Sequence, residues 1–195
     1  MYLICKIKLP VTWVNKMKHK EKLIIYVWLC SLAVILLVGI VLCLQRPPTE
    51  IVQANKDIVN MSEKIRAYYR NRPDYWGLNN SEAINLNLYV GKINNNQIIN
   101  NLNKNVIIGS DINGSQVMPG QHSFLIGYKD LNKKECVELA SLYWAEEDKL
   151  GLISVIIQND SGNYEFSWGD KGLPLSKGQA QKYCKEKNNI LWTFE

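Results

Sequence analysis

A run of 22 residues without a charged side chain, residues 23–44, constrains this chain more than any other feature. As an α-helix rising 1.5 Å per residue, the run would extend about 33 Å, enough to cross a hydrocarbon core of about 30 Å. Six lysines lie within residues 1–22, ahead of the run, and Arg46 follows it. Lysine-rich flanks stay in the cytoplasm, so we expect a single-pass membrane protein with a cytoplasmic N-terminus and an exported C-terminal part.

A cleaved secretory signal is the main alternative for this run. Signal cores usually hold 7–15 apolar residues, and no small-x-small cleavage site follows here. A lipoprotein would need a small residue just before Cys30 or Cys43, and leucine precedes both. We therefore favour a basic cytoplasmic tail at 1–22 followed by a retained transmembrane helix at 23–44.

The charge distribution argues against a nucleic-acid partner. The formal net charge is +5, and residues 1–22 alone account for it. Residues 23–195 carry 17 basic and 17 acidic side chains, which cancel. The exported part therefore has no bulk electrostatic attraction for a polyanion.

After the run, Pro47 and Pro48 must interrupt the helix, because neither donates a backbone hydrogen bond. Apolar residues then recur at spacings of three and four, which predicts a helix with one apolar face, ending before Pro73. The face consists of Ile51, Ala54, Ile58, Met61, Ile65 and Tyr68. We interpret 45–72 as a core helix, and the same spacing also suits self-assembly between helices of neighbouring copies.

Asparagine dominates the next stretch, with eleven between residues 79 and 105. Asparagine favours turns, so we expect a break at 94–96, with short helices at about 81–88 and 97–102. The glycines and proline of residues 109–122 indicate an exposed loop.

The last third is more regular. A strand is expected at 123–128, and a helix from Asn132, with Glu135 as its capping partner. Strands at 152–157 and 163–168 flank a turn and form a hairpin, Ser176 starts a helix reaching about 186, and 190–194 is a final strand. The sum is an α+β domain at 73–195 with an antiparallel sheet, against which the 45–72 helix packs.

Only two cysteines, Cys136 and Cys184, fall in the exported part. In an oxidising compartment they can form one disulfide, closing a 48-residue loop and adding about 3–4 kcal/mol through loop entropy. A zinc site would need about four ligands, and the only exported histidine is His122. We favour the disulfide, which would tie the two late helices together.

No pattern indicates an enzyme, a cofactor or a metal site. His122 lies in a Gly/Pro-rich loop, where a solvated surface histidine is expected. The acidic cluster at 146–148 is best explained as a solvated face, since a hard cation would need more oxygen ligands. The tryptophans and tyrosines of the exported part leave two interpretations open: a ligand groove, or a core or subunit interface.

In order along the chain, these features resemble the type IVb pilins, including pilins of conjugative plasmids. The apolar run ending at residues 44–46 is similar to the family's membrane stalk, and residues 60–75 to the end of its long helix and the tyrosine-rich turn. Gly91 and the asparagines after it resemble the loop between helix and sheet. Residues 124–139 and 180–194 resemble its strand and Cys-bearing helix, and its C-terminal cysteine and last strand.

The resemblance implies a structural subunit or accessory protein of a type IV pilus, secretion or conjugation apparatus. Its partners would be the inner membrane, other pilin-like subunits or assembly proteins, and further copies of itself. The chain departs from the family in two ways: no glycine lies near the expected cleavage point at residues 20–21, and the expected glutamate position falls near Ile25. An unprocessed, membrane-anchored periplasmic binding or adaptor domain that forms no filament is therefore the alternative.

Overall fold

The computed structural model describes residues 27–36, 48–142, 151–169 and 172–195. The chain divides into two compact units, residues 1–46 and 47–195. In the first unit, residues 27–36 are helical. They form the middle of the predicted transmembrane run, and the rest of that run and the 1–22 tail lie outside the described residues. No helix within the described ranges is both long and apolar enough to cross a membrane.

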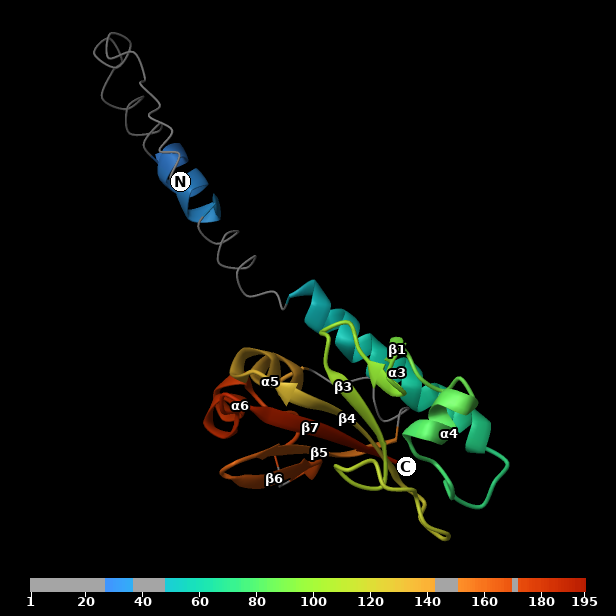
Figure 1. Cartoon of the computed structure of the whole chain (residues 1–195). Helices are drawn as coiled ribbons and strands as arrows, with labels where there is room; N and C mark the ends of the chain where they lie inside the picture. The colour runs from blue at the N-terminus through green and yellow to red at the C-terminus, as the bar shows by residue number, and fades with distance from the viewer. Residues whose placement is uncertain (1–26, 37–47, 143–150, 170–171) are drawn as a thin grey trace, which may run out of the picture. The chain divides into compact units, whose positions relative to one another are not determined.

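The second unit is an α+β domain with one seven-stranded sheet (Figure 1). Its helices are α3 (Thr49–Tyr69), α4 (Asn80–Asn85), α5 (Lys133–Ala140) and α6 (Lys177–Tyr183). Its strands are β1 (Lys92–Asn94), β2 (Gln97–Ile99), β3 (Asn105–Gly109), β4 (Phe124–Leu131), β5 (Leu152–Asn159), β6 (Gly162–Ser167) and β7 (Asn188–Phe194). The predicted α+β class with an antiparallel sheet is confirmed.

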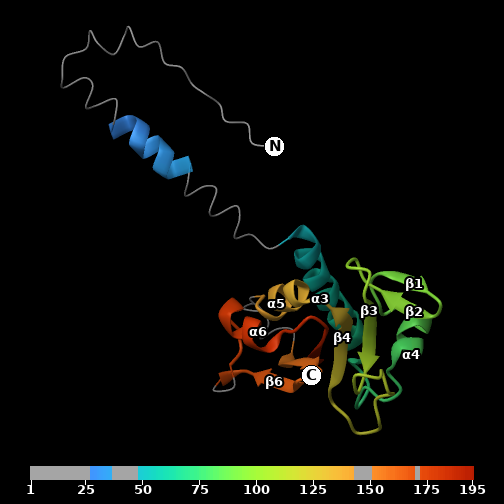
Figure 2. The same cartoon turned by 60° about the vertical axis from the view of Figure 1, so that its left-hand side comes forward.

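The strand order is β1-β2-β3-β4-β7-β5-β6, and all neighbours are antiparallel. The C-terminal strand β7 is central, so Trp192 pairs with Ile126 on one side and Val155 on the other. The β1–β2 hairpin and α4 lie at one edge of the sheet, and β6 forms the other edge (Figure 2). A last strand in the sheet centre ties the two halves of the domain together.

Helix α3 lies within the 45–72 segment interpreted as a core helix, but it begins at Thr49 and ends at Tyr69, three residues early. The backbone N–H of Arg72 donates to the Tyr69 carbonyl at 2.8 Å, closing a turn before Pro73. The helix packs against the sheet through buried residues from Ile51 to Tyr69. Its partners include Ile126, Tyr128 and Trp192, which share the inner face of β4 and β7.

The predicted helix at 97–102 is wrong, because Gln97–Ile99 is strand β2. Asn95 and Asn96 both adopt positive φ (47° and 61°), the conformation of a two-residue hairpin turn that twists with its strands. The predicted break at 94–96 is thus a hairpin turn between β1 and β2. Strand β3 was not predicted either, since its four buried residues sit between an asparagine-rich stretch and a glycine loop.

The other elements expected in the last third are present, although β4 runs on to Leu131, α6 ends at Tyr183 rather than 186, and β7 begins at Asn188 rather than 190. Asn132 caps α5 and exchanges hydrogen bonds with Glu135 in a capping box, and Ser176 and Gln179 do the same for α6. Strands β5 and β6 form the expected hairpin. The short helix α4 begins one residue before the predicted start at 81 and ends at Asn85, earlier than the predicted end at 88.

Candidate functional site

The structure places the six residues of the predicted helix face along the α3–sheet contact. Ile51, Ala54, Ile58, Met61 and Ile65 are buried in the main core. Tyr68 is only partly buried, and the neighbouring Tyr69 is buried in its place. In the last turn of α3, the buried aromatic residue is therefore Tyr69, one position later than the spacing predicts.

Polar contacts fix α3 at its N-terminal half as well. The Tyr128 hydroxyl donates to the Ala54 carbonyl at 2.9 Å, and the Asn101 side-chain amide donates to the Glu50 carbonyl at 2.8 Å. Asp57 is buried on the same helix, and the Gln53 side-chain amide donates to its carboxylate at 2.8 Å. The helix is thus an integral part of the domain rather than a separable arm.

The predicted disulfide is present: Cys136 and Cys184 are bonded, with their Cα atoms 5.9 Å apart. Cys136 lies in α5 and Cys184 is the C-terminal cap of α6, and both are fully buried. A salt bridge between Lys177 and Glu138 (2.8 Å) joins the same two helices. The bond therefore holds α5 and α6 as one pair beside the sheet.

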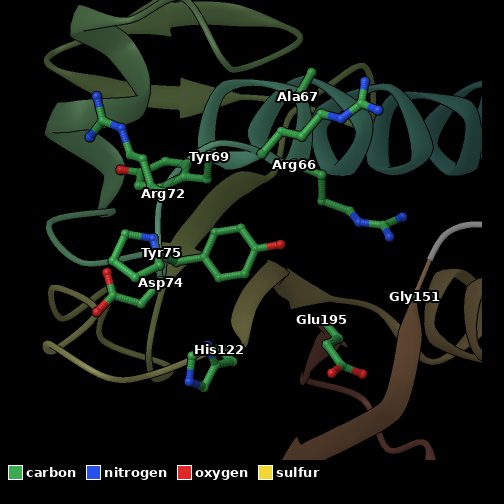
Figure 3. A pocket seen from close by; sticks show the side chains of 11 residues that line it. Arg66, Ala67, Tyr69, Arg72, Asp74, Tyr75, His122, Gly151 and Glu195 are labelled. Atoms are coloured by element: carbon green, nitrogen blue, oxygen red, sulfur yellow. The ribbon is translucent and has the colours of Figure 1, made fainter.

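An open pocket of about 780 Å³ lies at the C-terminal end of α3 (Figure 3). Its lining comes from the end of α3, the turn after it, the loop before β4, the residue before β5 and the residue after β7. The residues are Arg66, Ala67, Tyr69, Arg70, Arg72, Pro73, Asp74, Tyr75, His122, Gly151 and Glu195. No sequence pattern predicted this site, because its side chains come from four separate segments.

Aromatic contacts organise one wall of the pocket. The rings of Tyr69 and Tyr75 lie 5.3 Å apart, and Tyr75 continues to Phe124 at 4.7 Å. The Arg72 guanidinium lies over the Tyr68 ring at 4.4 Å and donates to the Tyr68 hydroxyl at 2.6 Å. Stacking and hydrogen bonding together hold this guanidinium against the helix end.

Two tyrosines and one aspartate of the pocket have shifted pKa values. Burial raises the pKa of Tyr69 and of Tyr75 above the ordinary tyrosine value, although Arg72 and Arg66 respectively oppose the shift. Backbone N–H groups of Gly120 and Trp76 donate to the Asp74 carboxylate and lower its pKa. Both tyrosines therefore stay protonated and Asp74 stays ionised near pH 7, so these shifts create no general acid or base.

The described aromatic residues differ in whether they lie in the core or at the surface. Trp192, Tyr128 and Phe124 are core residues with at most 1% exposure. Trp76 is 59% exposed and Trp168 40%, and neither lines the pocket at the end of α3. Trp144 and the acidic cluster at 146–148 lie outside the described residues. Most of the described aromatic surface thus serves packing rather than a groove.

Within the described parts of the chain, no group of three or more His, Cys, Asp or Glu side chains could hold a metal ion. His122 is exposed and lies at the rim of the pocket at the end of α3 (Figure 3).

No family model matches the chain, and no curated protein matches its sequence. Among solved structures, a type IVb pilin from Salmonella typhi is similar at 11% identity, covering 74% of this chain and 96% of that chain, with a TM-score of 0.44. TcpA, a type IV pilin from the Vibrio cholerae El Tor biotype, is similar at 12% identity, covering 76% of this chain and 100% of that chain, with a TM-score of 0.48. These structural neighbours are type IV pilins.

Proposed function

We propose that the chain is a pilin-like, membrane-anchored structural subunit or accessory protein of a type IV pilus, secretion or conjugation apparatus. One observation carries the proposal: the 21-residue helix α3 follows the predicted membrane run closely and buries one face along an antiparallel sheet. A helix that follows a membrane anchor and also forms part of the core of a folded domain suits a structural subunit, because the anchor is then joined directly to the folded domain.

Two further features support a structural role. The Cys136–Cys184 bond cross-links the domain near its C-terminal end. The pKa shifts in the pocket at the end of α3 move its tyrosines and Asp74 away from neutrality, which does not favour acid–base catalysis. The proposed partners are the membrane, pilin-like subunits or inner-membrane assembly proteins, and further copies of the chain.

A periplasmic binding or adaptor domain that forms no filament is the second candidate. Two sequence features favour it: no glycine lies near residues 20–21, and an apolar residue, Ile25, stands where the resemblance calls for a glutamate. An unpaired carboxylate inside an apolar helix destabilises that helix in the membrane. A chain without the glutamate avoids this cost, but it also lacks the carboxylate that could pair with a neighbouring subunit. A chain of this kind would stay in the membrane unprocessed.

The intact mass of the protein from native membranes separates these two functions. The full chain has a mass of 22.4 kDa, and cleavage after about 20 residues would remove about 2.3 kDa. A loss of that size would support the filament subunit, and the protein should then appear in sheared filaments. A full-length mass would support the permanently anchored accessory domain. Release of the protein from membranes by alkaline carbonate would contradict both.

A further inference from the structure

Two hollows lie on the outer face of the sheet, the face opposite α3. Successive side chains of a strand point to opposite faces, so Leu125 and Leu191 point away from α3, whereas Ile126 and Trp192 pack toward it. Leu125 and Leu191 belong to a second, smaller apolar cluster, and Ile112 of the loop between β3 and β4 packs against it. This loop therefore lies over the outer face, and the two hollows lie beside it.

Amide side chains dominate both hollows. The first hollow, of about 240 Å³, lies toward the β1–β2 hairpin, and the second, of about 400 Å³, lies toward the β5–β6 hairpin. Lys129 lines both of them, and nine of the seventeen described lining residues are Asn or Gln. We call the pair the amide hollows, defined by Asn96, Gln97 and Asn113 in the first and by Gln158, Asn163 and Asn189 in the second.

Much of the hydrogen-bonding capacity of these amides is not used within the fold. Two lining side chains are structural: Asn80 bonds to the backbone of β3, and Asn159 bonds to the backbone of Tyr183 and Ser161. Within the described ranges, five of the other lining amides make no side-chain hydrogen bond, namely Asn96, Gln97, Asn105, Asn113 and Asn163. Each such amide offers two N–H donors and one carbonyl acceptor, so the hollows present donors and acceptors together.

One row of polar side chains crosses four neighbouring strands in the second hollow. Gln158 of β5 lies opposite Asn189 of β7 and Asn163 of β6, and Lys129 of β4 lines the same hollow. The Asn189 side-chain amide donates to the Gln158 side-chain carbonyl at 3.3 Å, which orients both side chains. Neighbouring strands lie about 4.8 Å apart, close to the length of one sugar unit in a linear chain, whereas an extended peptide advances about 3.3 Å per residue. The row therefore matches the repeat of an oligosaccharide better than that of a peptide.

The amide hollows carry no excess of positive charge. Lys129 and Lys187 line them together with Asp130 and Asp160, so the charges of the described lining residues cancel. The charged residues beside these add two lysines and three acidic side chains, which are Lys92, Lys104, Asp111, Glu135 and Glu165. A polyanion therefore finds no net attraction on this surface, and a neutral ligand is the better match.

We propose that the amide hollows bind a neutral oligosaccharide, whose hydroxyl groups exchange hydrogen bonds with the unused amides. A hydroxyl both donates and accepts, as a primary amide does. The loop that carries Asn113 is held in place, because the Asp111 carboxylate accepts from the backbone N–H groups of Asn113 and Ser115. None of the described lining residues is aromatic, so ring stacking is missing and each site binds weakly, and firm attachment needs many copies acting together. The inference goes beyond the proposed function and does not depend on the membrane anchor.

Saturation-transfer NMR of the full chain tests this binding. The chain is held in micelles of a detergent without a sugar headgroup, because such a headgroup would compete for the site. The probes are two neutral tetrasaccharides: chitotetraose, which carries acetamido groups, and maltotetraose, which carries hydroxyl groups without them. We expect saturation to reach the ring protons of at least one of them, and the preferred one shows which kind of chain the site takes. Gln97→Ala/Asn163→Ala removes one unused amide from each hollow and should weaken binding about tenfold.

Asn60→Ala/Gln181→Ala provides the matched control. It removes the same two types of side chain from exposed positions on α3 and α6, and it should leave the affinity unchanged. Circular dichroism establishes that both double variants fold. Transfer to neither tetrasaccharide, or equal weakening in both double variants, would overturn the proposal. Binding confined to an anionic chain such as heparin, or to an uncharged extended Gly/Ser peptide, would overturn it in favour of a polyanion or a peptide. The intact mass and the carbonate extraction test the proposed function separately from all of these outcomes.

Discussion

At the residue scale, Tyr128 shows how one side chain joins helix to sheet. It is fully buried on β4, its hydroxyl donates to the Ala54 carbonyl of α3, and its ring packs edge-on against Trp192 at 5.4 Å. Burial is the main reason that its pKa is raised far above the usual tyrosine value, and the nearby Asp57 raises it further. The buried hydroxyl must therefore stay protonated in the folded state.

This predicts a loss of stability in alkali. Folding raises the pKa of Tyr128. Its contribution to the free energy of unfolding is therefore fully present below the pKa of an unfolded tyrosine, about 10, and is lost progressively as the pH rises above that value. Tyr128→Phe should cost about 1 kcal/mol at pH 7, from the lost hydrogen bond, and should make the decline between pH 9 and about 11.5 shallower. Urea unfolding across this pH range measures both effects. An unchanged alkaline slope in the variant would show that the decline comes from other groups.

At the element scale, α3 is held mainly by the apolar face that its spacing predicted. Ile58 is fully buried at the middle of that face, whereas Asn60, two residues on, points to solvent. Its two ends are fixed differently, by the Asn101–Glu50 bond at the start and by the aromatic contacts around Tyr69 at the end.

Truncation on this face should therefore be costly. Ile58→Ala should reduce the free energy of unfolding by about 2–5 kcal/mol, because it removes buried apolar surface and leaves a cavity in a packed core. Asn60→Ala provides the control on the exposed side and should change it by less than about 0.5 kcal/mol. Chemical denaturation monitored by circular dichroism compares the two. Similar costs at both positions would contradict the burial of this face.

At the scale of the whole molecule, the fold depends on contacts between distant parts of the chain. Strand β7 occupies the sheet centre although it is last in sequence, and the disulfide links residues 48 positions apart. Both features mean that the C-terminal segment stabilises elements formed much earlier in the chain.

Removing the cross-link should test that dependence. Cys136→Ser with Cys184→Ser should lower the free energy of unfolding by about 3–4 kcal/mol, since the unfolded chain regains the entropy of a 48-residue loop. Reductant should lower the stability of the natural chain similarly and leave the double variant unaffected. Cys30→Ser removes the free cysteine among the described residues and should have no effect. A double variant as stable as the natural chain would show that the core alone holds α5 and α6.

Local signals in the sequence determined much of this protein: the apolar face of α3, the capping boxes of α5 and α6, the β5–β6 hairpin and the α+β class all follow from patterns within a few residues. Tertiary structure alone decided two things. Asparagine tolerates both loops and positive-φ hairpin turns, so only pairing with β1 and β3 made 97–99 a strand. The pocket at the end of α3 joins segments distant in sequence, and contact between such segments leaves no periodic trace along a chain.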